Sequence, residues 1–196
     1  MRLVLATNNK GKVKELKEML AELPIEISSL EDYPELGEIE ENGTTFEENA
    51  LIKARAVAQH TGLPAMADDS GLEVDFLNGA PGVYSARFAG EPKSDEANNA
   101  KLLRELAGVP EENRSARFRC VIALVHPDGR EYTAHGTCEG RITFEPSGSG
   151  GFGYDPLFYV AEFDKTFAQL DSTSKNTISH RGRALKDAIK ILKNML

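Results

Sequence analysis

The sequence predicts an α/β fold, a mixed twisted sheet with flanking helices in two lobes around a central cleft. Short apolar stretches of strand character alternate with segments of helical periodicity, which is typical of this class. One long hairpin adds antiparallel strands to the sheet. With 196 residues, the chain is long enough for a substantial interior, and it has no linker that would separate independent domains. We therefore expect a single domain over residues 1–196.

The N-terminal part begins with a strand over residues 2–6 and continues as a helix that should stop near Pro24. The buried face of this helix is expected to be formed by Val13, Leu16, Leu20 and Leu23. A second strand is expected within residues 25–30. Residues 31–43 are acidic and irregular, with glycine and proline as breakers.

A second helix is predicted after two threonines that can cap it. Thr44 and Thr45 each precede a glutamate by three residues, which matches a capping box. The apolar stripe of this helix is Phe46, Ala50, Ala54 and Val57. Lys53 is assigned to the polar face, where it either neutralises nearby acids or makes a surface ion pair. After Pro64, residues 65–67 form a strand that leads into two aspartates.

The C-terminal part carries the hairpin and a last helix. Ser94 is expected to cap a helix that ends near Leu106. Residues 116–125 and 131–143 then form the two strands of the hairpin around a Pro-Asp-Gly turn. A further strand is expected at 157–160, and a final helix at about 179–192.

Composition and charge exclude several classes of protein. The net charge of −8 disfavours a nonspecific binder of duplex DNA or of anionic membranes, because both need a cationic face. The first apolar residues are too few for a signal peptide, and no apolar run approaches the length of a membrane helix. Cys120 and Cys138 lack metal-binding spacing and are expected to be buried free thiols. We expect a cytoplasmic protein.

The adjacent acids Asp68 and Asp69 are the most informative feature of the chain. Carboxylates near an apolar strand lose hydration unless a cation or hydrogen bonds compensate them. With Glu40 or Glu41 from the acidic stretch, they could converge on Mg²⁺, which prefers oxygen ligands and serves phosphate chemistry. The alternative is that the Asp-Ser-Gly sequence simply forms a turn.

Three other segments carry donors suited to a nucleotide. Residues 7–12 (TNNKGK) lie between a strand and a helix start, where a phosphate could bind, although the spacing is not that of a P-loop. Residues 149–156 combine glycines, which let the backbone approach a ligand, with Phe152 as a stacking face. Residues 174–176 and 179–183 gather cations before the last helix. The alternatives are a solvated loop, a flexible connection and plain surface charge.

Taken in order, these segments resemble one family over essentially the whole chain. The motifs are ATNNKGK at 6–12, FEENALIKAR at 46–55, ADDSGL at 67–72, GAPGVYSAR at 79–87, GGFGYDP at 150–156 and SHRGRAL at 179–185. Each motif alone is weak, but the ordered set is specific. The chain resembles the Ham1/RdgB-type inosine triphosphate pyrophosphatases, the non-canonical purine NTP pyrophosphatases, whose fold is related to that of the Maf proteins.

The resemblance implies a cytoplasmic, homodimeric, Mg²⁺-dependent enzyme that hydrolyses ITP, dITP and XTP to the monophosphate and pyrophosphate. It implies that Asp69 is the proton acceptor and that Glu40 and Asp69 ligate the metal. The residues implied in substrate binding are Thr7, Asn8, Asn9, Lys10, Gly11, Lys12, Ser70, Phe152, Gly153, Tyr154, Asp155, Lys175, His180 and Arg181. Nucleic acids and membranes are not expected as partners.

The chemistry of the base is consistent with that activity. Hypoxanthine and xanthine carry an acceptor at position 6, where adenine carries a donor. Donors near His180 and Arg181 would therefore favour the oxo bases, because ATP would leave a bond unmade at a cost of roughly 1–3 kcal/mol. Two rival hypotheses remain at this point: a pyrophosphatase for another altered nucleotide on the related fold, and a nucleotide sensor without turnover.

Overall fold

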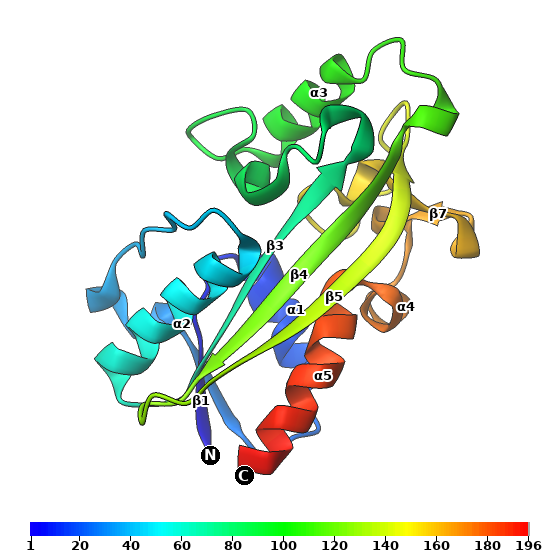
Figure 1. The fold of residues 1–196 in the computed structure, drawn as a ribbon. Helices are drawn as coiled ribbons and strands as arrows, with labels where there is room; N and C mark the ends of the chain where they lie inside the picture. The colour runs from blue at the N-terminus through cyan, green and yellow to red at the C-terminus, as the bar shows by residue number, and fades with distance from the viewer. Residues whose placement is uncertain (196) are drawn as a thin grey trace. The chain divides into compact units, whose positions relative to one another are not determined.

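A computed structural model describes residues 1–195 of the chain and contains a seven-stranded sheet in the order β2-β1-β3-β4-β5-β6-β7 (Figure 1). The strands are β1 (Arg2–Leu5), β2 (Glu26–Ser29), β3 (Ala65–Val74), β4 (Ser115–Val125), β5 (Glu131–Ile142), β6 (Phe158–Val160) and β7 (Lys165–Thr166). The helices are α1 (Lys10–Leu20), α2 (Phe46–Thr61), α3 (Asp95–Glu105), α4 (Ser172–Ile178) and α5 (His180–Met195).

The sheet is mixed, as the sequence predicts. Strand β1 runs parallel to both β2 and β3, whereas β6 pairs antiparallel with β5 and β7. The chain divides into two compact units, and β3, β4 and β5 each contribute residues to both. Unit 1 comprises residues 1–69, 120–136 and those from Arg181 onward; unit 2 comprises residues 70–119 and 137–180. The α/β class is confirmed, and the assignment of 1–196 as one domain stays a prediction.

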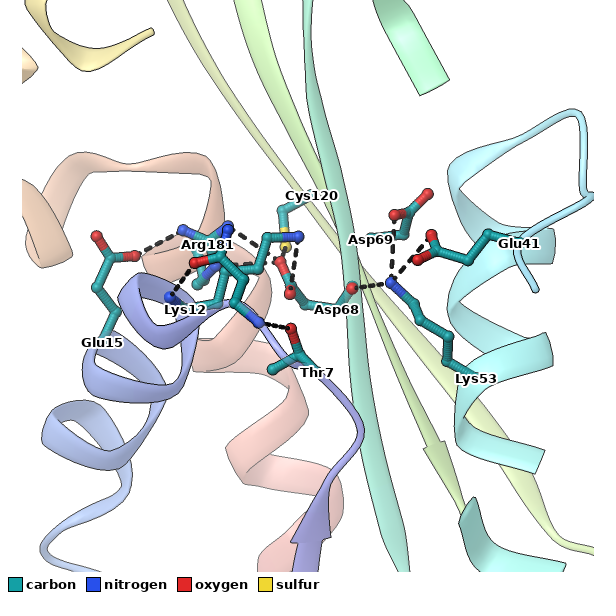
Figure 2. A network of polar contacts seen from close by, with 10 residues as sticks. Thr7, Lys12, Glu15, Glu41, Lys53, Asp68, Asp69, Cys120 and Arg181 are labelled. Carbon is teal, nitrogen blue, oxygen red and sulfur yellow. Dashed lines mark hydrogen bonds and ion pairs between the residues drawn. The ribbon is translucent and has the colours of Figure 1, made fainter. Parts of the chain in front are cut away.

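In unit 1, helices cover both faces of the sheet. Helices α1 and α5 lie on one face and α2 lies on the other (Figures 1 and 2). The core beneath α1 and α5 joins Leu3 and Leu5 of β1 to Leu16 of α1 and Leu185 of α5. Helix α2 begins at the predicted capping box, in which Thr45 and Glu48 each accept a backbone N–H of the other, and it ends at Gly62 in the left-handed conformation.

Unit 2 has its own core and a polar hub that fixes its loops. The aromatic side chains Phe118, Phe158 and Phe167 pack together at its centre. Asn98 on α3 is buried, accepts the Ala89 N–H at 2.7 Å and donates to the Ala86 carbonyl at 2.9 Å. Because buried polar groups are costly unless they are paired, these bonds fix the segment before α3 to that helix.

Several elements differ from the expectation, among them the short strand β7, which was not predicted. Helix α1 begins at Lys10, so half of the segment 7–12 is helical, because Asn9 caps the helix by accepting the Lys12 N–H at 3.1 Å. Strand β3 does not stop before the acidic pair but continues to Val74, past the residues Ala65 and Met66 that pair with β1, and β4 is its neighbour on the other side. The short helix α4 was not predicted; Asp171 caps it.

Two expectations about the chain as a whole can also be compared with the structure. Cys120 and Cys138 are both buried and free, as predicted. Within residues 1–195, no helix has the length and apolar character needed to cross a bilayer.

Leu16→Ala should destabilise the protein by about 2–5 kcal/mol, because Leu16 is fully buried between α1 and the sheet. The free energy of unfolding in urea measures this. The exposed residue Lys17 on the same helix gives the matched control, and Lys17→Ala should change stability by no more than about 0.5 kcal/mol. Equal stabilities of the two variants would contradict the packing of α1.

Candidate functional site

The two adjacent aspartates lie within β3, and their side chains point to opposite faces of the sheet (Figure 2). Successive side chains of a strand alternate in this way. Asp68 faces α1 and α5, whereas Asp69 faces α2. The expectation that both acids converge with a glutamate on one ion assumed that the strand ends before them. It is wrong, because inside a strand the two carboxylates diverge.

On the α2 side, Lys53 joins two carboxylates. Its Nζ lies 3.3 Å from Asp69 Oδ1 and 3.3 Å from Glu41 Oε2, and it donates to the Asp68 carbonyl oxygen at 2.8 Å. Lys53 is buried rather than on the polar face. Its spacing from Ala50 and Val57 places it on the apolar stripe of α2, and this spacing was the signal that could have revealed it. Of the two alternatives for Lys53, neutralisation of the acidic pair is the one observed.

Asp69 has the properties of a carboxylate that can take up a proton near neutral pH. Burial raises the pKa of Asp69 to about 6, against the opposing effect of Lys53 and Lys12. Its Oδ2 atom is buried and has no hydrogen-bond partner among the described residues. At pH 7 the group is therefore mainly ionised, and one oxygen is unused by the protein.

The acidic stretch contributes Glu41, not Glu40, to this side of β3. Glu41 is half-buried and shares Lys53 with Asp69, while Glu40 is exposed. The end of the stretch is fixed because the buried Asn49 accepts the Gly43 N–H at 2.8 Å. Glu41 is therefore the glutamate that lies next to Asp69 in the structure, and Glu40 as a metal ligand stays a prediction.

The donor set on this side fits a magnesium ion. No cluster of three or more His, Cys, Asp or Glu side chains suited to a metal occurs within the described part of the chain. Mg²⁺ does not need one, because it usually binds one or two carboxylates, several waters and the phosphates of a substrate. The unused buried oxygen of Asp69, with the Glu41 carboxylate nearby, meets that requirement.

On the other face, Asp68 lies between two cations. Its Oδ1 is 3.1 Å from Lys12 Nζ, and its Oδ2 accepts hydrogen bonds from Arg181 Nε at 3.1 Å and Nη2 at 3.0 Å. Arg181 Nη1 donates in turn to Glu15 at 2.6 Å. Burial would raise the pKa of Asp68, but Lys12, Arg181 and Lys53 outweigh it and hold the pKa below its usual range.

Two further features of this face were not predicted. Glu15 is buried and pairs with Arg181. Its position in the sequence, next to the apolar Leu16, does not indicate that it is buried or that it has a distant partner. The Cys120 thiol lies 3.7 Å from Asp68 Oδ2, and burial and then the Asp68 charge raise the pKa of that thiol. The guanidinium of Arg181 donates to Asp68 and Glu15, and its expected role in substrate binding stays a prediction.

The segment 7–12 forms the start of α1. Thr7 is buried and its Oγ1 accepts the Asn9 N–H at 3.2 Å, while Asn8 and Lys10 are exposed. Gly11 and Lys12 lie in the first turn of the helix. A helix N-terminus attracts anions through its backbone N–H groups and its dipole, and Lys12 adds a cation whose side chain is partly exposed. This end of unit 1 can hold a phosphate.

In unit 2, the glycine-rich segment forms a second group around Asp155. Its Oδ2 pairs with Lys175 Nζ at 2.6 Å and accepts the Phe152 N–H at 3.1 Å. The Lys175 ammonium also lies over the Phe152 ring, 4.8 Å from its centroid. Gly151 has a φ of +70°, and a Cβ there would lie 2.0 Å from Asp155 Oδ2, so no other residue fits.

The remaining expected residues lie in unit 2 as well. The hydroxyl of Tyr154 donates to the Ser85 carbonyl at 2.5 Å, which ties Tyr154 and its neighbour Gly153 to the loop before α3. The ring of His180 stacks on Phe118 with centroids 4.7 Å apart. Ser70 follows Asp69 on β3 and is half-buried. A purine ring could stack on an aromatic side chain of unit 2 such as Phe152, and it could receive hydrogen bonds from the neighbouring cation Lys175.

The comparisons with known proteins agree with one another. Residues 3–191 match the Ham1 family. A protein of Desulforamulus reducens named dITP/XTP pyrophosphatase is 63% identical, over 100% of this chain and 97% of its own length. A protein of Geobacter sulfurreducens with the same name is 60% identical, over 94% and 92%. The structure of a HAM1 protein from Coxiella burnetii is similar with a TM-score of 0.89 at 45% identity, covering 99% of both chains. By sequence and by fold, the chain belongs to the Ham1 family.

Proposed function

We propose that this protein hydrolyses ITP, dITP and XTP to the nucleoside monophosphate and pyrophosphate. The relatives at 63% and 60% identity are named dITP/XTP pyrophosphatases, and they match nearly the whole chain. The observation that carries the proposal is the setting of Asp69, a buried carboxylate whose pKa is raised to about 6 and whose Oδ2 has no protein partner in the described part of the chain. A base of this kind can take a proton from water near neutral pH.

Residues of unit 1 are proposed to activate the water and to bind the triphosphate. Asp69 accepts the proton of the water that attacks the α-phosphorus, and Lys53 holds Asp69 and Glu41 together. The start of α1 and the Lys12 ammonium bind the triphosphate. Asp69 and Glu41 would hold Mg²⁺, which supplies positive charge beside the phosphate oxygens and lowers the pKa of water.

The group in unit 2 is proposed to recognise the base. Phe152 offers its ring for stacking, and Lys175 and His180 can donate to the 6-oxo group. ATP would present its own donor there and leave a hydrogen bond unmade. The expected contact of Arg181 with the base stays a prediction, as do the homodimer, the cytoplasmic location and the absence of nucleic-acid or membrane partners.

The proposed activity is tested by pyrophosphate release with Mg²⁺ from ITP, dITP, XTP, ATP, GTP and dTTP. We expect release from the first three to be at least about tenfold faster than from ATP, whose 6-amino group leaves one hydrogen bond unmade. Turnover of another nucleotide alone would overturn the reading of the base site. No release from any nucleotide would favour a sensor.

Asp69→Asn should lower kcat by about 10²–10⁴-fold, because the amide cannot accept the proton of the water. The change is isosteric, so circular dichroism and the Tm should show an intact fold. Asp187→Asn, at an exposed position of α5, is the matched control and should leave kcat unchanged. Near-normal kcat for Asp69→Asn would remove Asp69 from the role of base.

Glu41→Gln should weaken Mg²⁺ binding by at least about tenfold, because a neutral amide replaces a charged ligand next to Asp69. Glu40→Gln removes the same charge one residue earlier, at an exposed position, and should have little effect. Calorimetric titration with Mg²⁺ compares the two variants. Equal weakening would indicate a general charge effect, and the reverse order would restore Glu40 as the ligand.

A further inference from the structure

Asp68 is the carboxylate for which the proposed reaction has no use. Its side chain is 0% exposed and points away from Asp69, to the other face of β3 (Figure 2). Both of its oxygens are engaged, Oδ1 by Lys12 and Oδ2 by Arg181. Because the protein itself engages both oxygens, the effect of Asp68 has to be found in the neighbours that it holds.

Lys12 is the neighbour whose position matters most for a triphosphate. A lysine side chain samples many rotamers in water, and anion binding has to restrict them. The ion pair at 3.1 Å restricts the Lys12 ammonium before any ligand arrives. An ammonium has three N–H groups, and this ion pair requires only one. The Lys12 side chain is 14% exposed, so it is not sealed from solvent.

Asp68 is itself held from the opposite side. Arg181 donates to Asp68 through Nε and Nη2, and Glu15 accepts from Arg181 Nη1. Lys12 and Glu15 lie on α1, one turn apart, so the contacts form a closed ring through α1, β3 and α5. Because these contacts fix the Asp68 carboxylate, it is the Lys12 side chain that adapts its conformation to form the ion pair.

A negative charge next to a phosphate-binding lysine weakens the attraction of that lysine for phosphate. A carboxylate here therefore weakens phosphate binding, unless fixing the position of the ammonium strengthens binding by more than the negative charge weakens it. A group that is already in position binds its ligand more tightly, because the entropy cost of ordering it has been met before the ligand binds.

We propose that Asp68 is a positioning residue that fixes the Lys12 ammonium for the triphosphate of the substrate. This inference rests on the proposed function, in which Lys12 binds the phosphates. The competing explanation is that Asp68 only joins α1, β3 and α5 as part of the fold. The two explanations differ in whether the effect of Asp68 on binding depends on the presence of Lys12.

A double-mutant cycle separates them. We expect Asp68→Asn to raise KM for XTP about tenfold, and Lys12→Met to raise it at least as much. In the Lys12→Met background, Asp68→Asn should add little, because the group that it positions is gone. Multiplying effects would overturn the proposal and leave Asp68 a structural residue. Glu15→Gln is the matched control: it loosens Arg181, leaves the contact of Lys12 with Asp68 in place, and should raise KM less than Asp68→Asn.

The same cycle is measured with tripolyphosphate binding, which needs no turnover. If XTP is not hydrolysed but the two substitutions are coupled in tripolyphosphate affinity, the proposed function fails and the role of Asp68 stands. Uncoupled affinities overturn the role of Asp68 whatever the enzyme hydrolyses.

Asp68→Asn leaves Arg181 with a weaker partner and can impair folding, so a measurement on the unaltered protein is also needed. The ammonium of Lys12 should give a resolved ¹H–¹⁵N signal at low temperature without nucleotide, because a fixed, hydrogen-bonded ammonium exchanges slowly with water. Lys12→Met assigns the signal by its loss. A Lys12 ammonium that exchanges as fast as those of exposed lysines would overturn the proposal.

Discussion

The alternation of side chains along β3 is the constraint on which the rest of the site depends. Two acids adjacent in sequence are turned to opposite faces of one sheet, and each meets a different helix (Figure 2). Asp69 meets Lys53 of α2, and Asp68 meets Lys12 of α1. A single dipeptide thus contacts the helices on both sides of the sheet. Asp69 can therefore take part in the reaction while Asp68 positions Lys12.

The charges around this dipeptide are close to balance but not equal. Among the described residues, the ion pairs around Asp68 and Asp69 join three cations, Lys12, Lys53 and Arg181, to four carboxylates, those of the two aspartates, Glu15 and Glu41. The surplus is negative and lies on the side of Asp69, which explains why burial can raise the pKa of that acid even beside a lysine. A partly buried surplus of this sign is unfavourable in the protein alone, and a cation that arrives with the substrate would relieve it.

Local patterns predicted most elements of the fold, because periodicity and capping are properties of neighbouring residues. The capping box of α2 and the Ser94 cap of α3 are examples. The site was harder to predict, because its geometry depends on contacts distant in the chain. The extension of β3 past Asp69 and the pairing of Arg181 with Glu15 are set by tertiary neighbours, and no local signal reported them. The contact of Glu41 with Lys53 likewise depends on the path of the loop.

The position of Cys120 has a consequence for the reactivity of the protein. Thiols react with oxidants and alkylating agents as thiolates. Cys120 is buried against Asp68, and the carboxylate that orders the lysine also disfavours a second negative charge on sulfur. The Cys120 side chain therefore packs as a small apolar group. Its thiol is expected to react slowly with oxidants, so the neighbouring ion pairs of Asp68 are compatible with a cysteine at this position.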